Sequence, residues 1–158
     1  MPALLQPPVP SAASPHLRWN SLHGSARALA LAEAVSQDPR LWVGIVAGSR
    51  ELERLGAELR FFAPALELLT LPDWEVLPYD QFSPHPDIVS ERLRTLARLP
   101  QLKHGLLLLT AESLLTRLPP PSYVASRSFD LQRGTTLEVE PLRLRLTEAG
   151  YLSVSQVR

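Results

Sequence analysis

Three short, almost continuous apolar runs, separated by stretches with helical periodicity, most restrict the fold of this chain. The runs cover residues 41–47, 66–71 and 106–109. Between the first two, apolar residues recur every three or four positions after Ser49, as they do along one face of a helix. Strands that are apolar on both faces are buried on both faces, and their alternation with helices favours parallel pairing. The sequence therefore predicts an α/β fold, a parallel sheet with helices on both faces.

The helices can be placed from this periodicity and from their start and stop signals. Helical periodicity covers residues 25–35 and resumes after Ser49, which can cap the second helix. A third helix is predicted to begin at Asp87 and to end before Pro100. A fourth, short helix is predicted over residues 111–118. These helices alternate with the three buried strands.

Three consecutive prolines at positions 119–121 mark the likeliest domain boundary. We expect one domain over residues 17–120, preceded by a flexible, proline-rich leader over residues 1–16. Residues 121–158 are expected to form a partial α+β module, which we expect to be truncated because its last helix and strand need a partner sheet. Its predicted strand, turn, helix and final strand are residues 126–131, Gly134, residues 139–149 and residues 151–157.

The composition excludes several classes of function. The chain has no cysteine, so it cannot form disulfides, ligate zinc through cysteine or carry out thiol chemistry. No apolar stretch approaches the roughly 20 residues that span a bilayer, and the proline-broken start is unlike a secretory signal. We therefore expect a cytoplasmic protein. The four histidines lack the spacing of zinc ligands on a helix, so we expect no metal site; they are His16, His23, His85 and His104.

The charges are balanced over the whole chain but not along it. Residues 1–91 carry 6 Arg and 11 Asp or Glu, whereas residues 92–158 carry 10 Arg or Lys and 5 Asp or Glu. A basic half could contact nucleic acid or a neighbouring domain, and Arg92, Arg94 and Arg98 are the candidates. The alternative is a solvated face, which the scattered arginines and the spacing of Arg94 and Arg98 favour.

A nucleotide site in an open α/β sheet requires a strand-to-helix turn whose backbone N–H groups face the phosphates. We place the first such turn at residues 22–27. A P-loop has the pattern G-x-x-x-x-G-K-[ST], in which the lysine reaches the β and γ phosphates. Lys103 is the only lysine and is followed by His104, so the sequence contains no intact P-loop. Gly24 and Ser25 are either a degenerate remnant of one or the ordinary start of a helix.

The connection between the second predicted strand and the third helix is rich in proline and aromatic residues. Trp74, Tyr79 and Phe82 offer large contact surfaces there, on a backbone that several prolines restrict. We expect Trp74 and Tyr79 to pack within the domain; the alternative is a contact with a neighbouring domain or DNA. Four acidic residues in this region are interpreted as surface acids and not as paired catalytic carboxylates: Asp73, Glu75, Asp80 and Asp87.

The same loop resembles a known family. Its run D-W-E-x-L-P-Y-D-x-F-S-P-H-x-D-I-x-S-x-R-L resembles the N-terminal UvrB-homology region of transcription-repair coupling factors, the Mfd family. Two further matches are Gly24-Ser25-Ala26, at the family's degenerate Walker A position, and residues 149–157. The motif residues of the run that we take as the family signature are Trp74, Pro78, Tyr79, Asp80, Ser83, Pro84, His85, Asp87, Arg92 and Leu93.

The resemblance implies both a fold and a role. Proteins of this family release RNA polymerase stalled at DNA lesions with a translocase that uses ATP and magnesium, and they recruit UvrA. The region that this chain resembles is similar to UvrB domain 1a and part of domain 2, with a RecA-like fold and a degenerate nucleotide site. In the family it has no ATPase activity, contributes to autoinhibition and presents domain 2 to UvrA. We therefore expect no cofactor, and no motor or polymerase-binding domain, within these residues.

Two alternatives come from other functional classes. One is a UvrB-like, nucleotide-hydrolysing helicase domain, against which the missing lysine and serine or threonine pair argues. The other is a module that binds damaged DNA. The hypothesis of a DNA-binding module requires a continuous basic surface that includes Arg92, Arg94 and Arg98.

Overall fold

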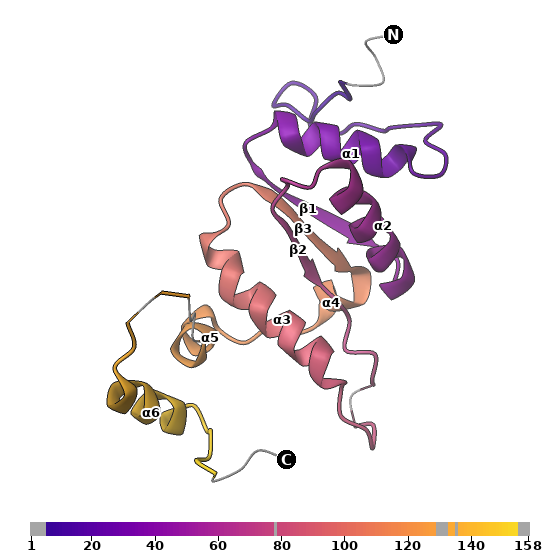
Figure 1. The fold of residues 1–158 in the computed structure, drawn as a ribbon. Helices are drawn as coiled ribbons and strands as arrows, with labels where there is room; N and C mark the ends of the chain where they lie inside the picture. Colours follow the sequence, from indigo (N-terminus) through magenta and orange to yellow (C-terminus); the bar gives the residue numbers. More distant parts are fainter. Residues whose placement is uncertain (1–5, 78, 129–132, 135, 155–158) are drawn as a thin grey trace. The chain divides into compact units, whose positions relative to one another are not determined.

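The chain divides into two units, Met1–Leu118 and Pro119–Arg158. Among the described residues, the first contains a sheet and most of the helices, and the second contains two short helices (Figure 1). Each unit is described by itself. The computed structural model describes residues 6–77, 79–128, 133–134 and 136–154.

The first unit is built on a three-stranded parallel sheet. β1 (Leu41–Val46) and β2 (Leu68–Leu71) both pair with the central strand β3 (Gly105–Thr110), which gives the order β1-β3-β2 (Figure 1). All six residues of β3 are buried. The prediction of a parallel α/β sheet is confirmed.

Helices lie on both faces of the sheet, although Val43 and Ile45 of β1 remain 54% exposed, so the prediction of strands buried on both faces is wrong for β1. The register aligns Leu107 of β3 with Val43 of β1 and with Leu69 of β2. Because successive side chains of a strand point to opposite faces, the even and odd leucines of β3 lie in two different cores. The first core lies under α1 (Ala26–Gln37) and α2 (Ser49–Phe62) and includes Leu55, Leu59, Leu106 and Leu108. The second lies under α3 (Pro86–Arg98) and includes Leu71, Leu96, Leu107 and Leu109.

The ends of these helices show why they begin and stop where they do. The N-cap of α2 is Gly48, so the predicted capping role of Ser49, the first helical residue, is wrong. His85 caps α3, because its Nδ1 accepts a hydrogen bond from the Asp87 N–H at 3.3 Å. Pro100 cannot donate a backbone hydrogen bond, and the chain continues after α3 as a 3₁₀ turn, Leu99–Gln101.

After β3 the chain forms α4 (Ala111–Leu115), which is shorter than the helix predicted over residues 111–118. The Thr110 side chain caps α4 by accepting a hydrogen bond from the Ser113 N–H at 3.1 Å. The prolines at 119–121 lie just beyond it, where the first unit ends.

The second unit differs from its prediction. α5 (Pro121–Arg127) is a helix that includes two residues of the strand predicted over 126–131, because Pro121 occupies a first helical position that suits its fixed φ. Residues 129–131 lie outside the described residues. The predicted helix is α6 (Val139–Glu148). Residues 151–154 form no strand, since the described part of this unit offers no strand to pair with, and residues 155–157 are not described.

Residues 6–25 form neither helix nor strand, although Pro10 contacts a later part of the same unit. The Trp19 indole N–H donates to the Pro8 carbonyl at 3.1 Å, and Arg40 Nη2 donates to the Pro10 carbonyl at 3.1 Å. Arg40 also pairs with Asp38 at 2.5 Å and thereby lowers the pKa of the Asp38 carboxyl. Over the described ranges, every helix is too short or too polar to span a bilayer.

Candidate functional site

The carboxyl edge of the sheet, where open α/β sheets bind nucleotides, is acidic. An acidic residue follows each strand within a few positions: Glu51 after β1, Asp73 after β2 and Glu112 after β3. The protonated Glu112 carboxyl donates a hydrogen bond to Asp73, and this bond together with the Asp73 charge raises the pKa of Glu112, so these two carboxyl groups are neighbours. Carboxylates at this edge repel the phosphates of a nucleotide.

The first strand-to-helix turn of the structure, residues 47–48, is occupied by one of these carboxylates. Glu51 Oε2 accepts a hydrogen bond from the Ala47 N–H at 3.2 Å, and its Oε1 pairs with Arg27 Nη1 at 2.6 Å. The Arg27 hydrogen bond, followed by that of Ala47, lowers the pKa of Glu51. A backbone N–H at this turn is therefore already bonded to an anion of the protein.

The residues considered as a P-loop remnant lie elsewhere. No strand precedes residues 22–27 within the described chain, so the prediction of a strand-to-helix turn there is wrong. Gly24 has a φ of +56°, and Ser25 occupies the N-cap of α1 without a side-chain capping hydrogen bond. Lys103 lies just before β3, at the amino edge of the sheet and opposite the nucleotide-binding edge.

The most highly organised polar group in the first unit is Arg92 of α3, which is only 1% exposed. Its Nη1 donates to the Pro72 carbonyl and to Ser113 Oγ, the latter at 3.1 Å, and its Nη2 donates to Thr116 Oγ1 at 3.4 Å. The guanidinium carbon lies 4.2 Å from the Trp74 ring centroid, a cation–π contact. Arg92 thus ties the loop after β2 to α3 and to the segment after β3. Burial lowers its pKa, with the Asp73 charge opposing the shift.

A second set of hydrogen bonds fastens α3 to β2 near Arg92. Thr95 Oγ1 donates to the Thr70 carbonyl at 2.6 Å, and Thr70 Oγ1 donates to Glu91 Oε1. Ser113 Oγ also donates to the Pro72 carbonyl, at 3.0 Å. The base of the loop is therefore held by polar contacts from two elements.

A sequence signal for the burial of Arg92 exists. Arg92 lies three residues after Val89 and four before Leu96, which places it on the apolar face of the third helix. An arginine on such a face needs polar partners, although the sequence does not show that Ser113 and Thr116 would supply them. Ser113 and Thr116 lie 21 and 24 positions after Arg92, so helical periodicity cannot reveal these contacts.

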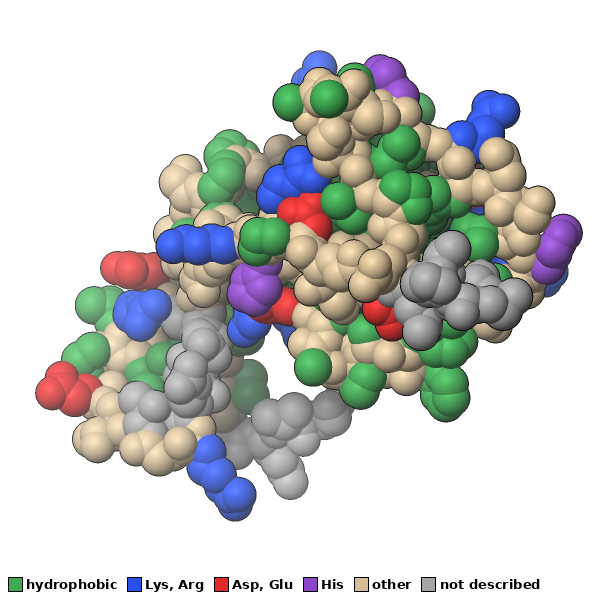
Figure 2. All heavy atoms as spheres, turned by 90° about the horizontal axis from the view of Figure 1, so that it is seen from above, with side chains coloured by type: hydrophobic (Ala, Val, Ile, Leu, Met, Phe, Trp, Pro, Cys, Tyr) green, Lys and Arg blue, Asp and Glu red, His purple; other side chains and the backbone are tan. Residues whose placement is uncertain are grey.

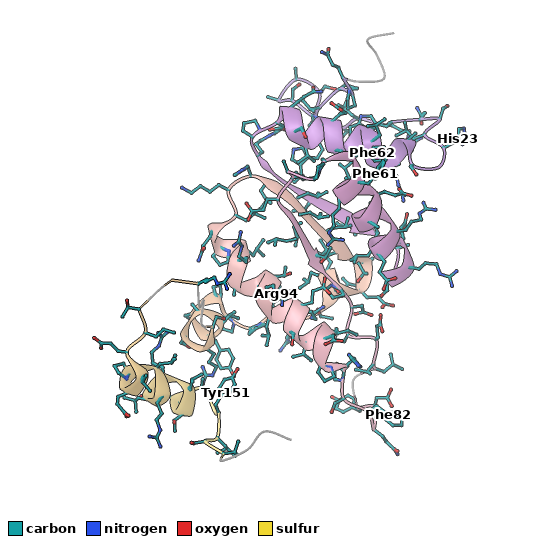
Figure 3. All side chains as sticks on the ribbon, viewed as in Figure 1. His23, Phe61, Phe62, Phe82, Arg94 and Tyr151 are labelled. Atoms are coloured by element: carbon teal, nitrogen blue, oxygen red, sulfur yellow. The ribbon has the colours of Figure 1, made fainter. Side chains whose placement is uncertain are left out.

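The aromatic residues of the loop do not behave alike. Trp74 is half-buried against Arg92. Tyr79 is fully exposed at 105% and Phe82 is 76% exposed, so the prediction that Tyr79 packs within the domain is wrong. Phe82 lies in the outermost part of the loop and points away from the sheet (Figure 3). The reason is that Arg92 fixes only the start of the loop.

The other residues of the motif lie on the surface of the loop and of α3. Asp80 Oδ1 accepts a hydrogen bond from the neighbouring Gln81 N–H at 2.9 Å. Ser83 and Asp87 are exposed, Pro84 is half-buried and Leu93 is 48% exposed. Pro78 lies outside the described residues. No group of three or more histidines and acids in the described part of the chain could hold a metal ion.

The three arginines proposed as a nucleic-acid or interdomain contact do not share one surface. Arg92 is inside the unit, Arg94 is exposed and Arg98 Nη2 pairs with Glu67 Oε1 at 2.5 Å. Figure 2 shows Lys and Arg side chains separated from one another on the face drawn there. The contacts of Arg92 therefore serve the architecture of the loop.

The first unit is a parallel α/β domain with an acidic carboxyl edge and a loop held by a buried arginine. No family model matches the chain. It is 36% identical to the transcription-repair-coupling factor of Haemophilus influenzae over 155 residues, and 34% identical to that of Escherichia coli over 157 residues. These alignments cover 98% and 99% of the chain but only 13% and 14% of the relatives. The chain belongs to the transcription-repair coupling factor family. It spans a small part of the length of these relatives.

Proposed function

We propose that this chain is a non-hydrolysing, N-terminal module of a transcription-repair coupling factor, similar to UvrB domain 1a and part of domain 2. Its first unit is a RecA-like scaffold with a degenerate nucleotide site, and it contributes autoinhibitory contacts with other domains. Its second unit contributes to the recruitment of UvrA. The similarity to coupling factors over nearly the whole chain supports this proposal.

The observation that carries the proposal is the chemistry of the carboxyl edge. Glu51 occupies the first strand-to-helix turn, and Asp73 and Glu112 follow the other two strands. Lys103, the only lysine of the chain, lies at the opposite edge. Hydrolysis by the P-loop mechanism needs a lysine on the phosphates and a hydroxyl on magnesium, and this edge offers carboxylates instead.

The activities of the whole protein are part of the same proposal. The family name indicates coupling of transcription to repair, which requires contact with RNA polymerase and with DNA. We assign those contacts, and the ATP and magnesium that drive translocation, to parts of the protein beyond this segment. The cytoplasm, where transcription occurs in bacteria, is the proposed location.

A UvrB-like hydrolase or a damaged-DNA-binding module is less well supported. The first needs the lysine that the carboxyl edge lacks. The second was based on Arg92, Arg94 and Arg98, of which one is buried and one is paired with Glu67.

We expect the chain to show no magnesium-dependent ATP binding and no ATP hydrolysis. Isothermal titration calorimetry with magnesium and ATP should give no saturable heat, because the carboxyl edge lacks a P-loop lysine and Glu51 occupies its first strand-to-helix turn. A phosphate-release assay should match the buffer blank. Saturable, magnesium-dependent binding in the micromolar range would overturn the proposal; if Lys103→Ala abolished it, that lysine would be the phosphate ligand.

We also expect UvrA capture by a full-length coupling factor to depend on the second unit. Deletion of residues 119–158 should abolish capture on immobilised UvrA, because the proposed recruiting surface is removed. Arg94→Ala in the intact protein is the control and should leave capture unchanged. Circular dichroism should confirm that the deleted protein remains folded. Equal capture by a folded deletion variant would contradict the assignment to this unit.

A further inference from the structure

A cavity of about 650 Å³ lies beside the start of α1. Its walls come from Pro10, from residues 17–22, from Arg27 in the first turn of α1 and from Trp42 of β1. This volume is within the range of small-ligand sites. Neither the coupling-factor assignment nor the loop signature accounts for this cavity.

The cavity is built for a ligand with negative charge and hydrogen-bond acceptors. Two arginines, Arg18 and Arg27, line it, and no Asp or Glu is among its lining residues. Arg27 uses Nη1 to pair with Glu51, whereas its Nη2 is buried without a hydrogen-bond partner. A buried N–H donor without a partner is costly, so a ligand oxygen or ring nitrogen that accepts from it would be stabilised.

A second unsatisfied donor lies on the same wall. The Trp42 indole Nε1 is buried and has no hydrogen-bond partner. The nearby Asp38 carboxylate is weakly stabilised by the indole, although the two groups do not meet at hydrogen-bond geometry. Both unsatisfied groups are donors, which selects a ligand that presents acceptors.

The remaining lining is aromatic and apolar. Trp19 and Trp42 line the cavity, and the hydrogen bond from the Trp19 indole to the Pro8 carbonyl at 3.1 Å fixes the orientation of that ring. Flat aromatic walls combined with arginines suit a planar base attached to a phosphate. In a duplex the bases are stacked and paired, so a base can enter such a cavity only from a single strand.

We infer that this cavity binds one nucleotide of a single-stranded nucleic acid, with the base between the tryptophans and the phosphate on the arginines. Arg18 is exposed and meets the backbone phosphate, and Trp19 and Trp42, which line the cavity, stack against the base. This inference goes beyond the proposed function, and none of the three acidic residues of the carboxyl edge lines the cavity. A negative result for ATP or for UvrA therefore leaves it unchanged.

Fluorescence anisotropy of a labelled ten-residue thymidine oligonucleotide with the whole chain tests this inference. The oligonucleotide should bind, and Trp19→Ala and Arg18→Ala should each weaken binding by about tenfold, because each removes a stacking or phosphate contact. Trp19→Phe, which keeps a stacking face, should retain most of the affinity. Arg94→Ala, which removes an exposed arginine of α3, is the matched control for Arg18→Ala and should have no effect.

Competition with unlabelled ligands distinguishes the sources of the nucleotide. A duplex of the same length, thymidine monophosphate and inorganic phosphate should all compete far more weakly than the single strand. Equal competition by thymidine monophosphate would assign the cavity to free nucleotides, and equal competition by phosphate would reduce it to a general anion site. Either result would overturn the inference, as would equal losses from Arg18→Ala and Arg94→Ala.

Discussion

Replacement of Arg92 by alanine is expected to lower the free energy of unfolding of the first unit by about 3 kcal/mol. The change removes the donor of three hydrogen bonds and the cation that lies over the Trp74 ring. It leaves the Pro72 carbonyl and the Ser113 and Thr116 hydroxyls with fewer partners in a buried space. Urea unfolding followed by circular dichroism measures the loss.

Two further variants separate the contacts of Arg92 from its charge. Arg92→Lys keeps the charge but not the planar fork, so it should recover only part of the stability. Arg94→Ala removes an exposed arginine two residues along the same helix and should change the stability by less than about 0.5 kcal/mol. If Arg92→Ala lowered the free energy of unfolding no more than Arg94→Ala does, contacts other than those of the Arg92 guanidinium would hold the loop after β2.

The loop that carries the family signature shows where sequence reasoning succeeds and where it stops. Trp74 and Tyr79 are both large aromatic residues in a proline-rich segment, and both were predicted to pack. Only Trp74 does so, because Arg92 reaches the start of the loop and nothing in the described chain reaches Tyr79. Contacts between residues about 20 positions apart have no period, so the sequence alone could not distinguish the two.

The sequence predicted the sheet more fully than the second unit, because the signal for a buried strand is local whereas strand pairing depends on distant residues. The apolar runs of β1, β2 and β3 are local signals that predict buried strands. Only β3 is buried along its whole length, because Val43 and Ile45 of the edge strand β1 are each 54% exposed. A strand in a two-helix unit needs a pairing partner that periodicity does not specify. A strand was predicted to begin at Ser126, but the structure has a helix there, α5, which begins at Pro121.

The cavity beside α1 had no counterpart in the sequence analysis. Trp19, Arg27 and Trp42 come from an irregular segment, a helix and a strand, and only folding brings them together. Gly24 and Ser25 are the sequence's candidates for a degenerate P-loop, at a predicted strand-to-helix turn. In the structure, the buried donor without a hydrogen-bond partner belongs to Arg27, two residues after Ser25.

Gly105→Ala is expected to destabilise the first unit by about 3 kcal/mol or more, because strain and steric overlap act together. Gly105 begins the central strand β3 with a φ of +110°, a conformation that side chains with L chirality rarely adopt. An added Cβ would lie 2.4 Å from the Glu67 carbonyl oxygen and 3.2 Å from the Glu67 Cβ. Since the 2.4 Å contact is with backbone, the start of β2 or β3 must move.

Gly24→Ala is the matched control for this prediction. Gly24 also has a positive φ, +56°, but a Cβ there would have no atom within 4 Å. Gly24→Ala should lower the free energy of unfolding by about 1 kcal/mol, which is the cost of placing a side chain at a positive φ. The difference between the two variants in urea unfolding therefore measures the steric overlap at Glu67 together with the greater backbone strain at a φ of +110°. Equal destabilisation by both would mean that β2 can move aside without cost, and that the register of the β2–β3 pair is not fixed by the absence of a side chain at Gly105.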